Sequence, residues 1–316
     1  MSNNLANDIS SEPTGNSTPV ISTRGLTMHF RRCEALTGVD LEIQPGTVFA
    51  LLGENGAGKT TMIRIMTGFQ NPTSGSCTVC GIDPTKDAQE VRRRIGYVSD
   101  APALYDWMSV AQIGGFTASF YDQDFLPRYQ NSIARYGIQP EQKIRHLSKG
   151  QRAKVVLSLA LAHDPQVLIM DEPTSGLDPK VRRSFLESMI DRAATGRTVF
   201  LSSHQISEVE RVADTIAILH RGRVRLHGPL AEIRESISQV VVDLDDPLRA
   251  LPELPESVEV LSEENEGRSR LLYVRHMLPD VIETLRGTTG VVDVKSRLAN
   301  LEEIFVACTT EAPVAV

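Results

Sequence analysis

Two hydrophobic patterns occupy the first part of the chain. Residues 20–44 alternate between apolar and polar side chains in two runs, which predicts two strands with a turn around residues 31–34. Residues 47–52 are almost continuously apolar, which is typical of a strand buried on both faces of a sheet. A glycine-rich loop follows, and residues 60–68 then carry apolar side chains at helical spacing, with Gly68 as the expected end of the helix.

Strand-like and helix-like patterns then alternate along the chain. Residues 101–147 are rich in aromatic side chains and have a mostly helical pattern. Further strands are expected at residues 95–99, 167–170, 198–202 and 215–219, and further helices at residues 154–162, 179–194 and 205–212. This alternation favours an α/β fold with a mainly parallel sheet that is covered by helices on both faces.

The composition changes near residue 20 and again near residue 229. Residues 1–19 are rich in Ser, Asn, Thr and Pro, which predicts a disordered tail. Residues 20–228 are expected to form the main domain, with a helical subdomain at about residues 101–147. Residues 229–316 contain short strand-like runs and two helical patterns but no motif with chemistry, so we expect a small accessory α+β domain there.

A phosphate-binding loop is predicted directly after the buried strand. Residues 53–60 match G-x-x-x-x-G-K-[ST] and lie between a strand and a helix, the context that supports this motif. Backbone N–H groups and the helix N-terminus would bind phosphates, Lys59 would add a positive charge, and the Thr60 hydroxyl would ligate Mg²⁺. The expected nucleotide-binding residues of this segment are Gly53, Glu54, Asn55, Gly56, Ala57, Gly58, Lys59, Thr60 and Thr61. A nucleoside triphosphate and Mg²⁺ are therefore expected to bind here.

Two carboxylates follow the apolar run at residues 167–170. Ligands of parallel sheets bind beyond the carboxyl ends of the strands, which is where Asp171 and Glu172 are expected. Asp171 is predicted to hold Mg²⁺, and Glu172 to orient or deprotonate the attacking water. Such a pair alone is often just a strand that ends in solvent, but the phosphate loop favours the catalytic interpretation.

Three further motifs accompany these residues: LSKGQ at 147–151, DEPTSGLD at 171–178 and SSH at 202–204. Together with the phosphate loop they resemble the motifs of the ABC (ATP-binding cassette) ATPases, over about residues 20–228. The resemblance implies a phosphate-loop cassette with an antiparallel β subdomain and a helical subdomain. It also implies an ATP-hydrolysing subunit that works with a membrane-spanning permease, as a homodimer or with a paired ATPase subunit.

The resemblance also implies roles for single residues. Phe30 would stack on adenine, although it could instead be a core residue of its strand. Asp178 would be the D-loop aspartate, and His204 would lie near the γ-phosphate, although a histidine alone is more often structural. The residues of the LSKGQ signature that would cap ATP bound by the partner subunit are Ser148, Lys149, Gly150 and Gln151.

The chain departs from the family pattern at two positions. Lys149 stands where the signature commonly has glycine, and Asp100 stands where the Q-loop commonly has glutamine. Asp100 is a candidate Mg²⁺ ligand, and the alternative is a solvated loop residue. Acidic residues at that position and the ending LEEIF at residues 301–305 resemble exporter-type cassettes, so an exporter is expected.

Composition and charge restrict the remaining possibilities. The net charge of −7 gives no basic field, so nucleic acid is not expected as a partner. No apolar stretch has the length of a membrane-spanning helix, and the N-terminus lacks the pattern of a secretory signal. We therefore expect a cytoplasmic protein that is held at the inner face of the cell membrane by the permease.

Three other functions stay open at the level of the sequence. An importer ATPase would share all of these motifs, and the cargo would be chosen by the permease. A soluble ABC ATPase acting on a macromolecule is less favoured, because the chain has one phosphate loop and no long coiled coil. A nucleotide-dependent scaffold without catalysis is disfavoured by the presence of Lys59, Asp171, Glu172 and His204.

Overall fold

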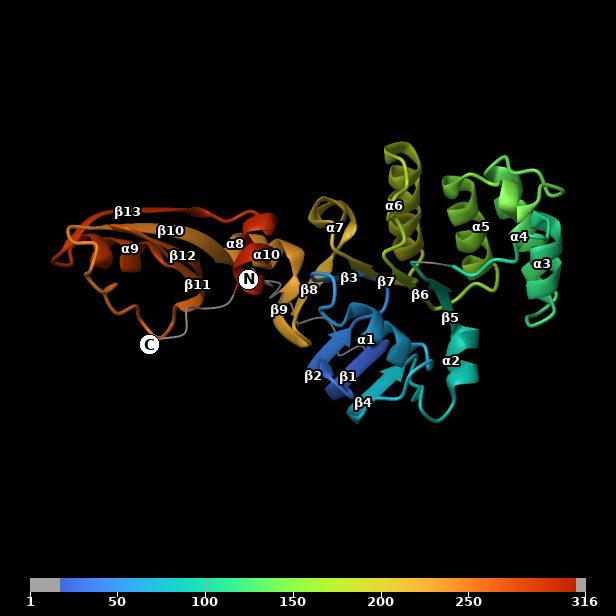
Figure 1. The fold of residues 1–316 in the computed structure, drawn as a ribbon, viewed down its shortest axis with the longest axis horizontal. Coiled ribbons are helices and arrows are strands. Elements are labelled where there is room, and N and C mark those ends of the chain that lie inside the picture. Colours follow the sequence, from blue (N-terminus) through green and yellow to red (C-terminus); the bar gives the residue numbers. More distant parts are fainter. Residues whose placement is uncertain (1–17, 101, 311–316) are drawn as a thin grey trace, which may run out of the picture.

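A computed structural model describes residues 18–100 and 102–310 of the chain. The molecule is elongated, with a central sheet, a helical part at one end and the C-terminal sheet at the other (Figure 1). The tail expected at residues 1–19 lies almost wholly outside the described residues. None of the helices in the described ranges is long and apolar enough to cross a membrane.

The central sheet has six strands in the order β5-β6-β7-β3-β8-β9. These strands are β3 (Val48–Leu52), β5 (Ile95–Val98), β6 (Val167–Asp171), β7 (Thr198–Ser203), β8 (Thr215–His220) and β9 (Arg223–Pro229). All pairs are parallel except β8 with β9. Every residue of β3, β6 and β7 is buried, which explains their continuous apolar character. The predicted parallel sheet is present, with an added antiparallel edge.

Helices cover both faces of this sheet. The helices α6 (Pro179–Ala194) and α7 (Ile206–Val212) lie on one face, and α1 (Lys59–Met66) lies on the other (Figure 1). The helix α1 ends before Gly68, whose φ of 71° is left-handed, as expected for the residue after a helix.

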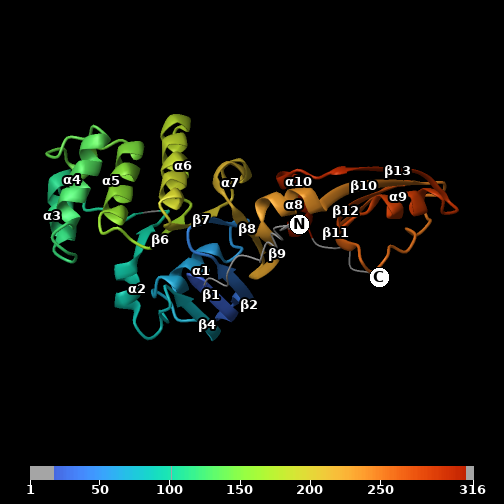
Figure 2. The ribbon, with the colours of Figure 1, turned by 180° about the vertical axis from the view of Figure 1, so that it is seen from behind.

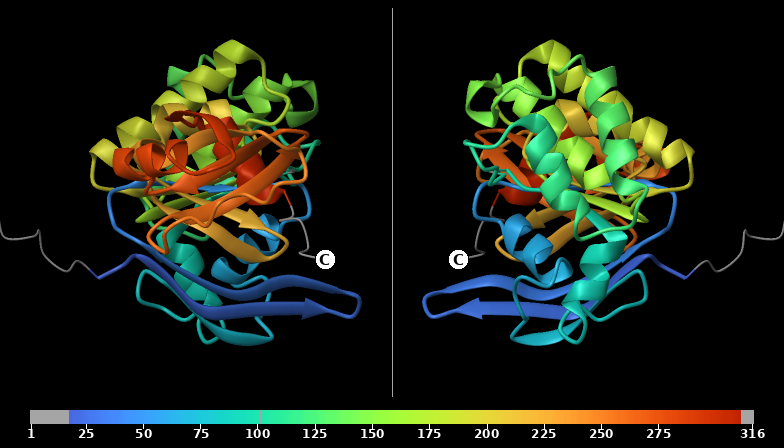
Figure 3. Two further views of the ribbon diagram at one scale, coloured as in Figure 1. Left: turned by 90° about the vertical axis from the view of Figure 1, so that its left-hand side faces the viewer. Right: turned by 90° about the vertical axis from the view of Figure 1, so that its right-hand side faces the viewer.

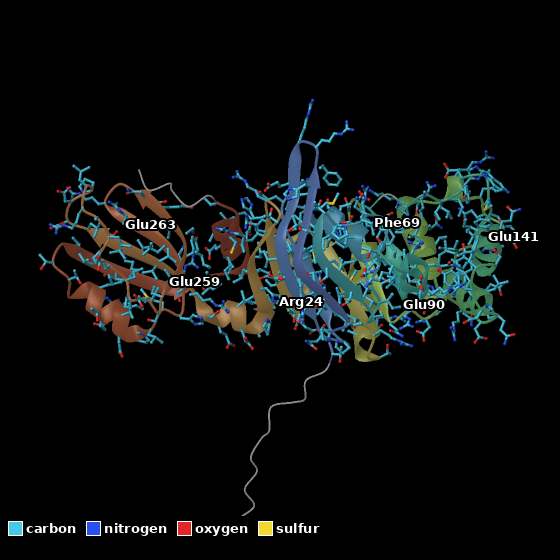
Figure 4. All side chains as sticks on the ribbon, turned by 90° about the horizontal axis from the view of Figure 1, so that it is seen from below. Arg24, Phe69, Glu90, Glu141, Glu259 and Glu263 are labelled. Atoms are coloured by element: carbon cyan, nitrogen blue, oxygen red, sulfur yellow. The ribbon has the colours of Figure 1, made fainter. Side chains whose placement is uncertain are left out.

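An antiparallel sheet of three strands lies beside α1, in the order β2-β1-β4. Its strands are β1 (Ile21–Phe30), β2 (Cys33–Ile43) and β4 (Ser74–Val79), and the short helix α2 (Ala88–Arg94) follows β4 in the chain. The β1–β2 pair, in blue, runs along the side of the molecule opposite the green and yellow helices (Figure 3). Figure 4 shows this sheet from below, with Arg24 on β1. A shared apolar cluster joins the sheet to α1 and to the central sheet.

The helical part lies at the end of the sheet next to β5 and contains three α-helices. They are α3 (Val110–Ala118), α4 (Phe125–Arg135) and α5 (Lys149–Leu161), with a short 3₁₀ turn at Ile144–His146. The helix α5 begins at Lys149, five residues before the start predicted from the apolar pattern. The side chains of Ser148 and Gln151 form a capping box that explains the earlier start.

The C-terminal part is a four-stranded antiparallel sheet with helices (Figures 1 and 2). Its elements are α8 (Leu230–Ser236), β10 (Ile237–Leu244), β11 (Glu259–Glu266), β12 (Ser269–Arg275), α9 (Pro279–Arg286), β13 (Val291–Leu298) and α10 (Leu301–Thr309). The sequence pattern missed α8 and β9. Ile233 of α8 and Ile304 of α10 share one apolar cluster with Ile218 of β8, so this cluster crosses the boundary expected at residue 229.

Candidate nucleotide site

The phosphate loop connects β3 to α1 and depends on close backbone packing. Gly58 caps α1 with a φ of 111°, and a Cβ atom on it would lie 2.4 Å from the carbonyl oxygen of Ala35. A Cβ atom on Gly53 would lie 2.5 Å from the carbonyl oxygen of Leu219. Only glycine fits at these two positions, because both contacts are with backbone atoms that cannot move aside.

Lys59 is held inside this loop. Its side chain is only 6% exposed, and its Nζ donates hydrogen bonds to the carbonyl oxygens of Gly53 (2.7 Å) and Glu54 (3.2 Å). The same ammonium forms an ion pair with Glu172 Oε1 at 3.3 Å. The loop therefore holds a buried positive charge at the N-terminus of α1, where anions are also favoured by the helix dipole.

A cavity of about 420 Å³ opens in front of the loop. Its lining residues are Phe30, Cys33, Ala35, Glu54, Asn55, Gly56, Gly58, Lys59, Thr60, Thr61, Asp100 and Glu172. Phe30 ends β1 and is 47% exposed, so it is not a core residue. The structure thus brings the expected adenine, phosphate-loop and Q-loop residues into one cavity of a size typical for small ligands.

Asp171 lies at the carboxyl end of β6 and is only 1% exposed. Its Oδ1 accepts a hydrogen bond of 2.5 Å from the Ser202 hydroxyl, and its Oδ2 is buried without a hydrogen-bond partner among the described residues. Asp171 does not line the cavity, but its unpaired Oδ2 and the hydroxyl of Thr60, which does line it, are hard oxygen donors of the kind that Mg²⁺ prefers. These residues fit a magnesium ion that keeps part of its water shell.

Asp100 belongs to the same electrostatic environment. Burial first, and then the carboxylates of Asp171 and Asp100, raise the pKa of Tyr97 on β5 to about 12. Both carboxylates therefore act on one phenol. Asp100 also lines the cavity together with Thr60, so it stays a candidate Mg²⁺ ligand.

Glu172 is held between a cation and a histidine. Its Oε2 lies 2.8 Å from His204 Nδ1, while its Oε1 faces Lys59. The backbone of Glu172 has a φ of 48°, which is uncommon for a residue with a side chain and costs about 1–3 kcal/mol. Its N–H donates to the carbonyl oxygen of Ser202 at 3.2 Å, which ties the strained residue to β7. Such strain is typical of functional positions.

The signature residues lie outside this cavity. Ser148 Oγ accepts a hydrogen bond from the N–H of Gln151, and Gln151 Oε1 accepts one from the N–H of Ser148. Gly150 is buried, and a Cβ atom on it would lie 3.0 Å from Val181 of α6. The exposed Lys149 passes over Gly176 in the turn that leads to α6. In this chain, the signature packs against α6 and the turn before it.

Asp178 acts as the N-cap of α6. Its Oδ1 accepts hydrogen bonds of 3.1 Å from the N–H groups of Lys180 and Val181, and Pro179 occupies the first helical position. These contacts explain why the sequence pattern predicted the start of α6 correctly.

The sequence did not reveal a buried polar network behind Glu172. Glu208 of α7 is only 2% exposed and contacts Thr174 and Arg182. No local pattern marks these three residues, since Thr174 and Glu208 are 34 residues apart. Cys33 and Ala35, which also line the cavity, have no motif either.

Proteins of known family resemble this chain in sequence and in fold. The family model described as ABC transporter matches residues 36–175. The chain is 32% identical over 303 residues to the Nod factor export ATP-binding protein I of Cupriavidus metallidurans, covering 92% of this chain and 98% of that protein. It is 34% identical over 209 residues to the ABC transporter ATP-binding protein NatA of Bacillus subtilis, covering 64% of this chain and 85% of that protein.

A solved structure described as the ATP binding subunit of an ABC transporter superposes on the chain with a TM-score of 0.64. The two are 29% identical, and the match covers 68% of this chain and 92% of the other. The predicted fold class, a phosphate-loop cassette with a mainly parallel sheet, is confirmed.

Proposed function

Because the chain belongs to the ABC transporter family as an ATP-binding subunit, we propose that it hydrolyses ATP in the cavity between Phe30 and Glu172 to energise an exporter. The observation that carries the proposal is the row of contacts from Lys59 through Glu172 to His204. A phosphate-binding cation, a carboxylate able to accept a proton and a histidine meet there at one edge of the cavity.

Hydrolysis requires Lys59 to change partners. When a triphosphate enters the loop, the ammonium would turn from the carbonyl oxygens of Gly53 and Glu54 to the β and γ phosphates. Glu172 would then lose its cationic partner and become free to orient and deprotonate a water, while His204 keeps its carboxylate in place. Thr60 and Asp171 would hold Mg²⁺, which neutralises charge on the phosphates.

The signature residues support a dimer as the active form. They lie on α5 and do not line the cavity of their own chain, so capping of ATP by Ser148 would need a second subunit. A homodimer or a pair with another ATPase subunit satisfies this requirement. The N-terminus of α5 and the Ser148 hydroxyl would then contact the γ-phosphate of the partner's nucleotide.

An exposed aromatic surface supports docking on a permease. Tyr105, Trp107, Phe116 and Phe120 form a chain of ring contacts in the helical part, and all four are exposed. A cavity of about 300 Å³ lies at the junction of the helical part with β5, lined in part by Leu104 and Tyr121. A permease element would bury these rings, which explains why so many aromatic side chains face solvent. We propose that the subunit is cytoplasmic and docks through this surface at the inner face of the membrane.

Transport out of the cell is supported by two observations. A relative that matches nearly the whole chain carries export in its name, and LEEIF resembles the ending of exporter-type cassettes. Cargo would be selected by the permease.

Nucleotide binding in the cavity can be tested with a thiol of the chain itself. Burial raises the pKa of Cys77 and Cys308 to about 12 and that of Cys80 to about 11, whereas Cys33 is exposed at the cavity wall. A maleimide at neutral pH should therefore label Cys33, and MgATP should slow that labelling at least tenfold. Cys33→Ser is the control for the site of labelling. Equal labelling of Cys33 with and without saturating MgATP would refute the proposed site.

A further inference from the structure

Glu172 and His204 are the proposed catalytic pair. Glu208 is a buried carboxylate that hydrolysis does not use directly. Glu208 accepts a hydrogen bond of 2.5 Å from the Thr174 hydroxyl at its Oε2, and its Oε1 forms an ion pair with Arg182 Nε at 3.1 Å. Glu208 and Thr174 are each only 2% exposed. A buried carboxylate is costly unless it is paired, so this network is a defined arrangement rather than a solvated surface contact.

The three residues come from the three segments that surround the catalytic pair. Thr174 lies in the turn between β6 and α6, two residues after Glu172. Arg182 belongs to α6 and also donates a hydrogen bond to the carbonyl oxygen of Leu177, at the end of the same turn. Glu208 belongs to α7, which begins two residues after His204. The network thus links the segment that carries Glu172 to the segment that carries His204.

Glu172 needs such support, since its left-handed backbone persists only when the surrounding structure holds it. We propose that Glu208 is a positioning residue for ATP hydrolysis, fixing the turn after Glu172 to α7 so that Glu172 and His204 keep their contact. This inference rests on the proposed hydrolytic function. It names a residue that touches neither the nucleotide cavity nor the reacting atoms.

Removing the network should lower turnover while nucleotide binding persists. A misplacement of about 1 Å can cost roughly 10²-fold in rate, so Glu208→Gln and Thr174→Val should lower kcat by about 10- to 100-fold. The KM for ATP and the MgATP protection of Cys33 should change by less than about twofold, because the phosphate loop is untouched. Thr174→Ser keeps the hydroxyl and should retain most of the wild-type kcat.

The chain offers a matched control for the loss of one carboxylate charge. Glu187 of α6 pairs with Arg183 at 2.8 Å on the exposed side of the helix, so Glu187→Gln should leave kcat unchanged. All variants are compared well below their midpoints of thermal unfolding. If Glu208→Gln does not fold, the kcat of Thr174→Val is compared with that of Thr174→Ser, and this comparison tests the inference instead.

The outcomes separate this inference from the function on which it rests. A wild-type protein without ATPase activity would overturn both. An active wild type with Glu208→Gln and Thr174→Val at the same kcat would overturn the role of Glu208 alone. Parallel loss of kcat and of Cys33 protection would assign Glu208 a purely structural role, and would also overturn the inference.

Discussion

Lys59 and Glu172 form an ion pair at the edge of the nucleotide cavity. In the proposed mechanism this ion pair must break before Lys59 can bind the phosphates and Glu172 can act on a water. The pairing explains how two opposite charges are tolerated with little exposure. Because the phosphates of ATP compete with Glu172 for the Lys59 ammonium, the entry of ATP would break this ion pair. At the scale of single residues, the proposed mechanism is therefore an exchange of partners.

Asp100 provides a prediction at this scale. Its carboxylate lines the cavity and acts on the same tyrosine as Asp171, so it should favour Mg²⁺ in the nucleotide complex. A single negative charge about 4 Å from a divalent cation in a solvated site contributes ~2 kcal/mol, or roughly 30-fold in affinity. Asp100→Asn and Asp100→Gln should therefore need about 30-fold more Mg²⁺ for half-maximal ATPase rate. Identical Mg²⁺ dependence in all three proteins would remove Asp100 from the metal site.

At the scale of elements, caps and packing position the site. The short segment from Asp171 to Asp178 follows β6, turns at Gly176 and starts α6, and each end is tied by side-chain hydrogen bonds. The helical part is joined to β5 through His163, whose Nε2 lies 2.9 Å from the carbonyl oxygen of Ile95. Its ring stacks on Tyr121 at 4.5 Å, so this histidine packs between α5, the aromatic rings and the sheet edge.

His163 should make the stability of the protein depend on pH. Burial lowers its pKa below the ordinary value of 6.5, so the unfolded chain binds the proton more readily than the folded one. The free energy of unfolding is then highest above pH 6.5 and decreases as the pH falls toward the folded pKa, by at most about 1.4 kcal/mol per pH unit. His227, whose pKa is also lowered by burial, adds in the same direction.

Urea unfolding at pH 7.5 and at pH 5.5 measures this loss of stability. His163→Gln should lose less stability between the two pH values than the wild type, whereas the exposed His146→Gln should lose as much as the wild type. The same loss in wild type and His163→Gln would contradict the role of the buried ring.

Some elements could be predicted from the sequence and others could not, for physical reasons. The start of α6 was predicted because Pro179 is a local signal for the first turn of a helix. The start of α5 was missed because its first turn is polar, although Ser148 and Gln151 carried the signal of the capping box. The edge strand β9 and the helix α8 were missed because they bury few side chains, Leu226 on β9 and Leu230 and Ile233 on α8, which leaves no clear apolar pattern.

At the scale of the whole molecule, the site is assembled from distant segments. Phe30, Asp100 and Glu172 come from three parts of the chain and meet only at the cavity. Glu172 could be predicted because it belongs to the DEPTSGLD motif, and Phe30 and Asp100 because the resemblance to ABC ATPases assigns their positions. Glu208 has no such signal and needed its partners in space. The boundary expected at residue 229 stays a prediction, although the shared cluster of Ile218, Ile233 and Ile304 stabilises both sides of it together.

The most direct test of the account is the rate of phosphate release from MgATP, measured over a range of protein concentrations for the wild type and Glu172→Gln. The wild-type rate per subunit should rise with concentration, because Ser148 of a second subunit must complete the site. Glu172→Gln should be slower by about 10²–10⁴-fold, since it lacks the base, while MgATP still protects Cys33 from labelling. A Glu172→Gln protein with wild-type turnover would contradict the account.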